Sequence, residues 1–221
     1  MKPDDREKAA VFSGLAEMER IWRGLENWAS QSLRTNKKEP ICYMVTSAER
    51  GEGKTTLTAS LAQALARRGE KRILAMDMNW HHPGFQAHFD IQSRWTLKDY
   101  RSASVNPIQP AGIAHLDVLP APVIEENEPH STAELSETAI NLLNTYRNRY
   151  DCVLIDTASL LPVNRNMVDP AVIGHVADAS ILVVLTHVTS RQNARRAQKM
   201  LESAGSQVAG IVINHREEGR C

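Results

Sequence analysis

The sequence has no excess of charge of either sign. Its 26 Lys and Arg residues are matched by 26 Asp and Glu residues, which gives a formal net charge of +0. A strongly basic balance, typical of chains that bind nucleic acid or anionic membranes, is absent. We therefore expect neither nucleic acid nor a lipid surface to be a direct partner of this chain.

Cysteine is also scarce. Of the three cysteines, Cys42 and Cys152 fall in short apolar runs and Cys221 is the last residue. This is neither a disulfide framework nor a metal site, and it favours the reducing cytoplasm. The only adjacent histidine pair, His81-His82, lies in a polar stretch and is expected to be solvent-exposed rather than metal-bound.

No apolar run approaches the length of a membrane span, and the N-terminal Met-Lys-Pro-Asp-Asp does not resemble a signal peptide. We therefore expect no direct membrane span and a cytoplasmic chain. The 221 residues suffice for one sizeable domain. We divide it into an N-terminal helix and link (1–36), a core (37–215) and a short tail (216–221).

The most informative segment, residues 47–56, reads Ser-Ala-Glu-Arg-Gly-Glu-Gly-Lys-Thr-Thr and follows the apolar run 41–45. It matches the phosphate-binding pattern G-x-x-x-x-G-K-[ST], except that Ala48 replaces the first glycine. Two glycines let the backbone approach phosphate oxygens, Lys54 can reach the β and γ phosphates, and the Thr55 hydroxyl can hold Mg²⁺. The residues expected to bind the nucleotide here are Ala48, Glu49, Arg50, Gly51, Glu52, Gly53, Lys54, Thr55 and Thr56.

Strand and helix patterns alternate along the rest of the chain. Such alternation predicts an α/β fold with a mainly parallel central sheet between helices, in three layers, and a long N-terminal helix before it. The expected strands are 41–45, 73–78, 116–119, 152–155, 180–185 and 210–213. The expected helices are 5–33, 54–68, 131–148, 171–177 and 190–204, while 79–112 is predicted to be irregular.

Polar residues stand at the ends of three predicted strands, where parallel sheets bind their ligands. Asp77 and Asp156 each end an apolar run, and beside a phosphate-binding loop we expect both to be catalytic residues with Lys54 and to hold Mg²⁺ with Thr55. The alternative for either Asp is a helix cap or turn former. Asn214 is a candidate for reading adenine, or a strand-end turn residue. No N-K-x-D guanine signature follows that strand.

From about residue 15 to residue 215, this combination resembles the bacterial tyrosine kinases, within the wider class of ParA/MinD-like ATPases. The resembling segments are 46–56, the strand that ends at Asp77, 116–121, 150–157 and 177–184. The resemblance implies ATP/ADP and Mg²⁺ as ligands and a role in exopolysaccharide or capsule export. It also implies recruitment to the inner face of the membrane by a polysaccharide co-polymerase.

Glu17, Arg20 and Arg23 fit the E-x-x-R-x-x-R pattern through which these kinases assemble, so the resemblance implies a homo-oligomer. The helix that carries them has an apolar stripe, which includes Met18, Trp22, Leu25 and Trp28. The stripe either supports self-association or is covered by the sheet domain of the same chain.

The sequence departs from the family pattern at its acidic motifs. The expected D-x-D-x-R reads Asp77-Met78-Asn79-Trp80-His81, Thr157-Ala158-Ser159 replaces Thr-Pro-Pro, and a later acidic position reads Asn164-Arg165. An amide coordinates metal through oxygen but brings no negative charge. These departures predict a chain that binds ATP and transfers phosphoryl slowly.

The C-terminal tyrosine cluster of these kinases is missing, since no tyrosine follows Tyr150. Of the other three, we expect Tyr43 in a strand, Tyr146 near a helix end, and Tyr100 as the most accessible. Two other functions stay open: a ParA/MinD-type positioning ATPase, disfavoured because Glu49 replaces the signature lysine, and a catalytically inactive nucleotide-binding scaffold.

Overall fold

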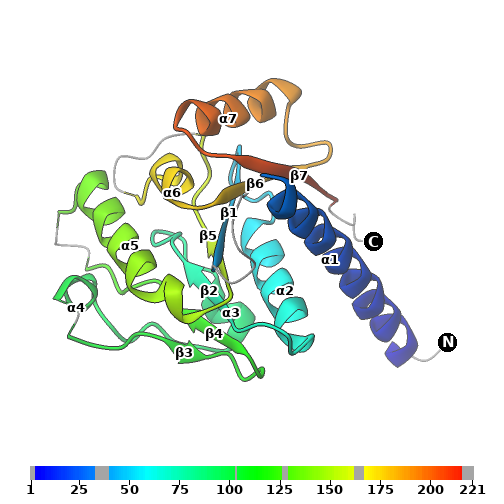
Figure 1. Cartoon of the computed structure of the whole chain (residues 1–221), viewed down its shortest axis with the longest axis horizontal. Helices are drawn as coiled ribbons and strands as arrows, with labels where there is room; N and C mark the ends of the chain where they lie inside the picture. Colours follow the sequence, from blue (N-terminus) through cyan, green and yellow to red (C-terminus); the bar gives the residue numbers. More distant parts are fainter. Residues whose placement is uncertain (1–2, 33–39, 103, 126–128, 162–166, 216–221) are drawn as a thin grey trace.

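A seven-stranded sheet runs through the centre of the chain and is flanked by helices (Figure 1). The computed structural model describes residues 3–32, 40–102, 104–125, 129–161 and 167–215, and of residues 3–13 only the helical backbone. The strands are β1 (Ile41–Ser47), β2 (Ile73–Asp77), β3 (Gln109–Pro110), β4 (Leu116–Leu119), β5 (Cys152–Asp156), β6 (Ala179–Leu185) and β7 (Val208–Asn214). Their order is β3-β4-β2-β5-β1-β6-β7, and every pair is parallel except β3 with β4.

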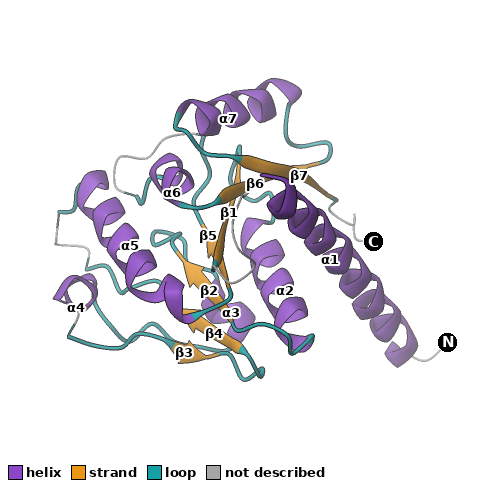
Figure 2. Cartoon of the chain, in the orientation of Figure 1, coloured by secondary structure: helices purple, strands orange, loops and turns teal. Residues whose placement is uncertain are grey.

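Helices cover both faces of this sheet, as Figure 2 shows by colour. The helices are α1 (Pro3–Ser32), α2 (Lys54–Arg67), α3 (Phe85–Phe89), α4 (Leu97–Ser102), α5 (Thr132–Tyr146), α6 (Pro170–Val176) and α7 (Arg191–Ser203), with a 3-10 turn at Arg147–Arg149. α1 and α2 pack on one face, while α5, α6 and α7 pack on the other. The predicted three-layer α/β class is confirmed.

The sequence of β1 explains why the sheet is buried on both sides. Successive side chains of a strand point to opposite faces. Cys42 and Met44 accordingly join the apolar cluster under α5, α6 and α7, while Tyr43 and Val45 join the cluster under α1 and α2. A strand that is apolar throughout is therefore the expected sequence for a central parallel strand.

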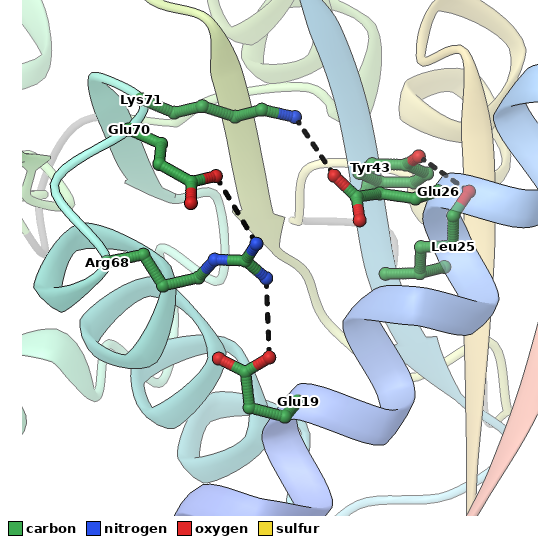
Figure 3. A network of polar contacts seen from close by, with 7 residues as sticks. All are labelled: Glu19, Leu25, Glu26, Tyr43, Arg68, Glu70 and Lys71. Atoms are coloured by element: carbon green, nitrogen blue, oxygen red, sulfur yellow. Dashed lines mark hydrogen bonds and ion pairs between the residues drawn. The ribbon is translucent and has the colours of Figure 1, made fainter.

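The N-terminal helix α1 packs on its own domain. Trp22 and Leu25 are buried against the sheet, and the Tyr43 hydroxyl donates a 3.2 Å hydrogen bond to the Leu25 carbonyl oxygen. Figure 3 shows this bond beside the ion pairs Arg68–Glu19 (3.3 Å), Arg68–Glu70 (3.2 Å) and Lys71–Glu26 (3.4 Å). Exposed ion pairs contribute about 0–1 kcal/mol each, so the buried side chains supply most of the docking energy. Of the two alternatives for the apolar stripe, coverage within one chain is the one observed.

The stretch 79–112 is more ordered than the sequence predicted. It contains α3, α4 and the short strand β3. α4 follows a capping box that sequence reasoning missed, in which the Asp99 carboxylate accepts from the Thr96 backbone N–H (2.8 Å) and the Asp99 N–H donates to the Thr96 hydroxyl (3.3 Å). In the part of the chain that the structure describes, no helix is long and apolar enough to cross a membrane.

Candidate nucleotide-binding site

The phosphate-binding loop connects β1 to α2 at the carboxyl edge of the sheet. Gly51 and Gly53 take positive φ angles of 82° and 92°, a conformation that only glycine adopts without strain. A Cβ atom on Gly53 would also lie 2.3 Å from Nδ2 of Asn214. Glycine is therefore required at position 53 by both backbone conformation and space, and α2 begins at the next residue.

A cavity of about 530 Å³ opens in front of this loop. One wall is the loop with the first turn of α2, and the other is formed by the segments that follow β2 and β5. The lining residues are Arg50, Gly51, Gly53, Lys54, Thr55, Thr56, Asn79, His81, His82, Ala158, Ser159 and Met167. A helix N-terminus that faces such a cavity favours an anion, because its first N–H groups have no partners within the helix.

Lys54 is the buried cation of this cavity. Its Nζ donates a 2.9 Å hydrogen bond to the Ser47 hydroxyl, which donates in turn to the Glu49 carbonyl oxygen at 2.6 Å. Burial lowers the pKa of Lys54, and the nearby carboxylates of Asp156 and Glu52 oppose this change. Ser47 was not predicted as a site residue, although it is the last residue of β1 and begins the loop motif.

Thr55 and Asp156 form the strongest candidate for a metal site. The Thr55 hydroxyl donates a 2.6 Å hydrogen bond to Oδ2 of Asp156, and the buried Oδ1 has no hydrogen-bond partner among the described residues. Burial raises the pKa of Asp156 to about 8, and the neighbouring Asp77 carboxylate adds to the rise. An orphaned buried carboxylate oxygen beside a threonine hydroxyl is a donor set that suits Mg²⁺.

Asp77 lies beside Asp156, because β2 and β5 pair these two residues in parallel register. Its Oδ1 accepts the Asn79 N–H (3.1 Å), and its Oδ2 accepts the N–H groups of Gly84 (3.0 Å) and Phe85 (3.2 Å). Burial raises the pKa of Asp77 to about 6, whereas these three backbone donors lower it. Asp77 therefore caps the turn before α3, the second of the two roles that the sequence left open.

The opposite wall of the cavity contains residues that sequence reasoning did not assign to the site. His81 and His82 are exposed, as expected, yet both line the cavity. Asn79 lines it too, and its Nδ2 donates a 2.9 Å hydrogen bond to the His82 carbonyl oxygen. A Cβ atom on Gly84 would lie 2.5 Å from Cγ2 of Thr55, so this turn packs directly on the loop. The signal in the sequence for Asn79 and His81 was their place in the D-x-D-x-R pattern, whereas His82 had no such signal.

The acidic residues of the loop turn toward the segment before and within α7. Glu52 is fully buried and accepts hydrogen bonds from the Thr189 hydroxyl and from the Glu49 N–H (2.7 Å). Oε1 of Glu49 accepts from Nδ2 of Asn193 at 2.6 Å. Neither glutamate is among the residues that line the cavity, so both shape the loop without presenting negative charge to a phosphate.

Asn214 ends β7 and contacts the loop from behind. Its Nδ2 donates a 3.0 Å hydrogen bond to the Glu52 carbonyl oxygen. It is not among the residues that line the 530 Å³ cavity. Its amide donor is therefore engaged in positioning the loop in this arrangement. Ala48 is buried, and its carbonyl oxygen accepts from the Leu161 N–H at 2.8 Å.

Glu17, Arg20 and Arg23 are all exposed on α1 and form no ion pair with another described residue. Glu17 and Arg20 line a second cavity of about 540 Å³ between α1 and β7, which also reaches Gly53 and Asn214. The structure therefore places the charged triad outside the nucleotide cavity but beside the rear of the loop.

The expectation that Tyr100 is accessible was wrong. It is buried under the sheet face, and its hydroxyl donates a 2.8 Å hydrogen bond to the Pro120 carbonyl oxygen. Tyr43 and Tyr146 are buried as well, and the half-buried Tyr150 donates to Asp117 at 2.9 Å. The prediction failed because residues 97–102 form a helix with one apolar face. Asn164, Arg165 and the tail 216–221 lie outside the described residues.

The fold and this site define a P-loop nucleotide-binding domain. The model of the CobQ/CobB/MinD/ParA nucleotide-binding domain matches residues 43–219, and the chain belongs to this family. The tyrosine-protein kinase YwqD of Bacillus subtilis (strain 168) is 31% identical over 206 residues, which cover 88% of this chain and 83% of that protein. The resemblance to bacterial tyrosine kinases is thereby confirmed.

Solved structures agree with the fold. The VpsO kinase domain superposes with a TM-score of 0.75 at 24% identity, covering 96% of this chain and 98% of that chain. MinD from Pyrococcus horikoshii OT3, in complex with Mg-ADP, gives a TM-score of 0.62 at 20% identity over 82% of this chain and 72% of that chain. The kinase domain is thus the closer match of these two.

Proposed function

We propose that the chain binds ATP and Mg²⁺ in the 530 Å³ cavity and transfers the γ-phosphoryl group to a tyrosine of another protein. The observation that carries this proposal is the pairing of Thr55 with Asp156, whose second carboxylate oxygen is buried and has no hydrogen-bond partner among the residues that the structure describes. Such an oxygen is costly to bury unless a ligand satisfies it, and Mg²⁺ is the ligand that suits a P-loop. The similarity to the tyrosine-protein kinase YwqD supports the choice of acceptor.

Different residues of the cavity would bind the phosphates and the metal. Lys54 lies next to the loop and supplies positive charge for the β and γ phosphates. Thr55 and Asp156 would hold Mg²⁺, and Asp77, which lies beside Asp156 in the paired strands, would add negative charge near it. The metal, when bound, offsets negative charge on the transferring phosphoryl group. The backbone N–H groups at Gly51 and Gly53 would orient the phosphates, because these residues lie in the loop that leads directly into the first turn of α2.

We place the acceptor tyrosine on a second protein. All four tyrosines of this chain are buried or half-buried, and those at 43, 100 and 150 donate their hydroxyl protons to partners inside the domain. A phenol must reach the γ phosphate in line, which none of these does without local unfolding. The resemblance set out above points to the cytoplasmic segment of a membrane polysaccharide co-polymerase as partner, in exopolysaccharide or capsule export, with the chain recruited to the inner face of the membrane.

One observation favours slow transfer, or a scaffold that binds nucleotide without transfer. Both Asp77 oxygens are already hydrogen-bonded to backbone N–H groups, and Asn79 offers an amide where the related kinases have a carboxylate. The Asn79 amide therefore brings no negative charge to the metal site, and the three N–H donors leave Asp77 less free to coordinate the metal. The slow kinase or scaffold and the active kinase share the same nucleotide site, and they differ only in the rate of phosphoryl transfer.

The decisive experiment incubates γ-labelled ATP and Mg²⁺ with the chain, with and without the co-polymerase segment, and identifies the labelled residue. We expect label on a tyrosine of the partner and little on this chain. Asp156→Asn should abolish the label, while Lys98→Met, an exposed substitution on α4, should preserve it. Nucleotide binding without any tyrosine label would leave the scaffold function in its place, and absence of nucleotide binding would contradict both.

A further inference from the structure

Helix α7 presents a row of cations that the nucleotide site does not use. Arg191, Arg195 and Lys199 recur every four residues and so lie on one face of the helix, with Arg196 beside them. All four are exposed, and none forms an ion pair or hydrogen bond with another described residue. In a chain of net charge +0, such a concentration on one helix is a local feature and does not follow from overall composition.

These cations border a groove. A depression of about 910 Å³ lies between α6 and α7, and all four cations line it. Ala171 of α6 and Met200 of α7 contribute apolar surface to the same depression. Figure 1 shows α6 and α7 packed together at the edge of the domain, with α1 against the opposite side of the sheet. The groove is therefore distinct from the nucleotide cavity and from the surface that carries Glu17, Arg20 and Arg23.

We propose that this groove is a docking site for an acidic peptide segment of a partner protein. Guanidinium groups bind carboxylates with paired hydrogen bonds, and three of the four cations are arginines. The 13 residues of α7 span about 20 Å, a length that about six residues of an extended peptide cover. The apolar contribution of Ala171 and Met200 suits a segment with apolar side chains between its acidic ones.

A membrane surface fits this groove less well. Helices that lie in a lipid interface bury large apolar side chains in it. The apolar residues of α7 other than Met200 are Ala194, Ala197 and Leu201, and the last two are buried against the domain. Met200 is therefore the only large apolar side chain that the helix could insert beside its cations, and a single one is little for an interfacial helix.

Nucleic acid fits less well too. Domains that bind nucleic acid through a basic face usually have a pI above about 9, whereas this sequence has a pI of about 7.1. Among the described residues that line the groove, none is an aromatic on which a base would stack. A short acidic peptide needs neither property, because it occupies only the groove.

The test is fluorescence anisotropy at low ionic strength with a labelled peptide of alternating Glu and Leu, without nucleotide. A peptide of alternating Gln and Leu serves as the ligand control. We expect saturable binding of the acidic peptide only. Arg195→Glu/Lys199→Glu should weaken it at least about tenfold, because two attractions become repulsions. The milder Arg195→Gln/Lys199→Gln should weaken it less, and circular dichroism checks that both variants are folded.

The matched control is Arg94→Glu/Lys98→Glu, which makes the same change in net charge at exposed positions before and within α4. It should bind the acidic peptide like the wild type. Equal weakening by the control and the α7 variant would overturn the proposal, as would no binding of the peptide by the folded wild type. Tighter binding of random-sequence duplex DNA, or of phosphatidylserine vesicles, through the same cations would replace it with another class of partner. Because no nucleotide is used, failure here leaves the phosphotransfer proposal untouched.

Discussion

The Thr55 hydroxyl donates a 2.6 Å hydrogen bond to the Asp156 carboxylate, which joins the start of α2 to the end of β5 across 101 positions of sequence. Both groups are thereby fixed at one point of the cavity before any ligand arrives. A metal that binds there meets donors already in place and orders few side chains on binding. Within the described part of the chain, the remaining Asp156 oxygen is buried without a hydrogen-bond partner, and the first prediction follows from this burial.

Without Mg²⁺, the stability of the domain should fall as pH rises from about 4 to about 8. Burial raises the pKa of Asp156 from 3.8 to about 8, so the folded chain holds a proton there that the unfolded chain has lost. A raised folded pKa contributes stability at low pH and loses it as pH rises, by at most about 1.4 kcal/mol per pH unit for one group. Urea unfolding across this range should show the slope in wild type and a smaller slope in Asp156→Asn. An identical slope in both would contradict the assignment.

Lys54→Met should weaken ATP and ADP binding at least about tenfold without unfolding the chain. The substitution removes a charge-assisted contact to phosphate, worth about 1.5–3 kcal/mol, and leaves an apolar side chain of similar length in a buried place. Calorimetry measures the affinities, and Lys98→Met is the exposed control. Equal nucleotide affinities in Lys54→Met and wild type would show that Lys54 does not contact the phosphates.

Asn214→Ala should weaken ATP and GTP binding by the same factor, about two- to tenfold. The Asn214 amide nitrogen donates a hydrogen bond to the Glu52 carbonyl oxygen, and the substitution removes this one bond that positions the loop. Competition titrations with both nucleotides distinguish this role from base recognition. If Asn214 reads adenine, the variant will lose ATP affinity selectively. In wild type we expect ATP to be preferred over GTP, since no guanine signature follows β7.

Asn79→Asp should lower the Mg²⁺ concentration needed for ATP hydrolysis, or raise the rate. The new carboxylate adds negative charge near the metal, beside Asp77. It also loses the amide that donates to the His82 carbonyl oxygen, so the metal-free chain should become less stable. Asn79→Ala, which loses the amide without adding charge, is the control for that effect. If Asn79→Asp and Asn79→Ala behave alike in turnover, this position does not belong to the metal site.

Arg20→Ala/Arg23→Ala should reduce oligomers in the presence of nucleotide, as measured by light scattering. Both side chains are exposed and bind no other described residue, so their loss should leave the fold intact. The apolar stripe of α1 is covered within the chain, which leaves the charged face for contact with a second copy. An unchanged mass distribution would argue against assembly through α1.

Local sequence determined the framework of this protein. The phosphate-binding loop is one contiguous segment, residues 47–56. Its two glycines act through their backbone conformation, and its lysine acts through its place at the start of α2. Central strands were predicted within about two residues, because a strand buried on both faces must be apolar throughout. Asp77 and Asp156 were placed together for a similar reason: parallel strands bring their carboxyl ends to one edge of the sheet.

Tertiary packing decided what those residues do. The Asp77 carboxylate is hydrogen-bonded because the turn before α3 directs the N–H groups of Gly84 and Phe85 at it. No described turn does the same for Asp156, whose Oδ1 has no hydrogen-bond partner among the described residues. Tyr100 is buried because α4 packs its apolar face on the domain. These outcomes depend on contacts between segments distant in sequence. Residue patterns specify which groups are apolar or charged, but only the folded chain determines which of them meet.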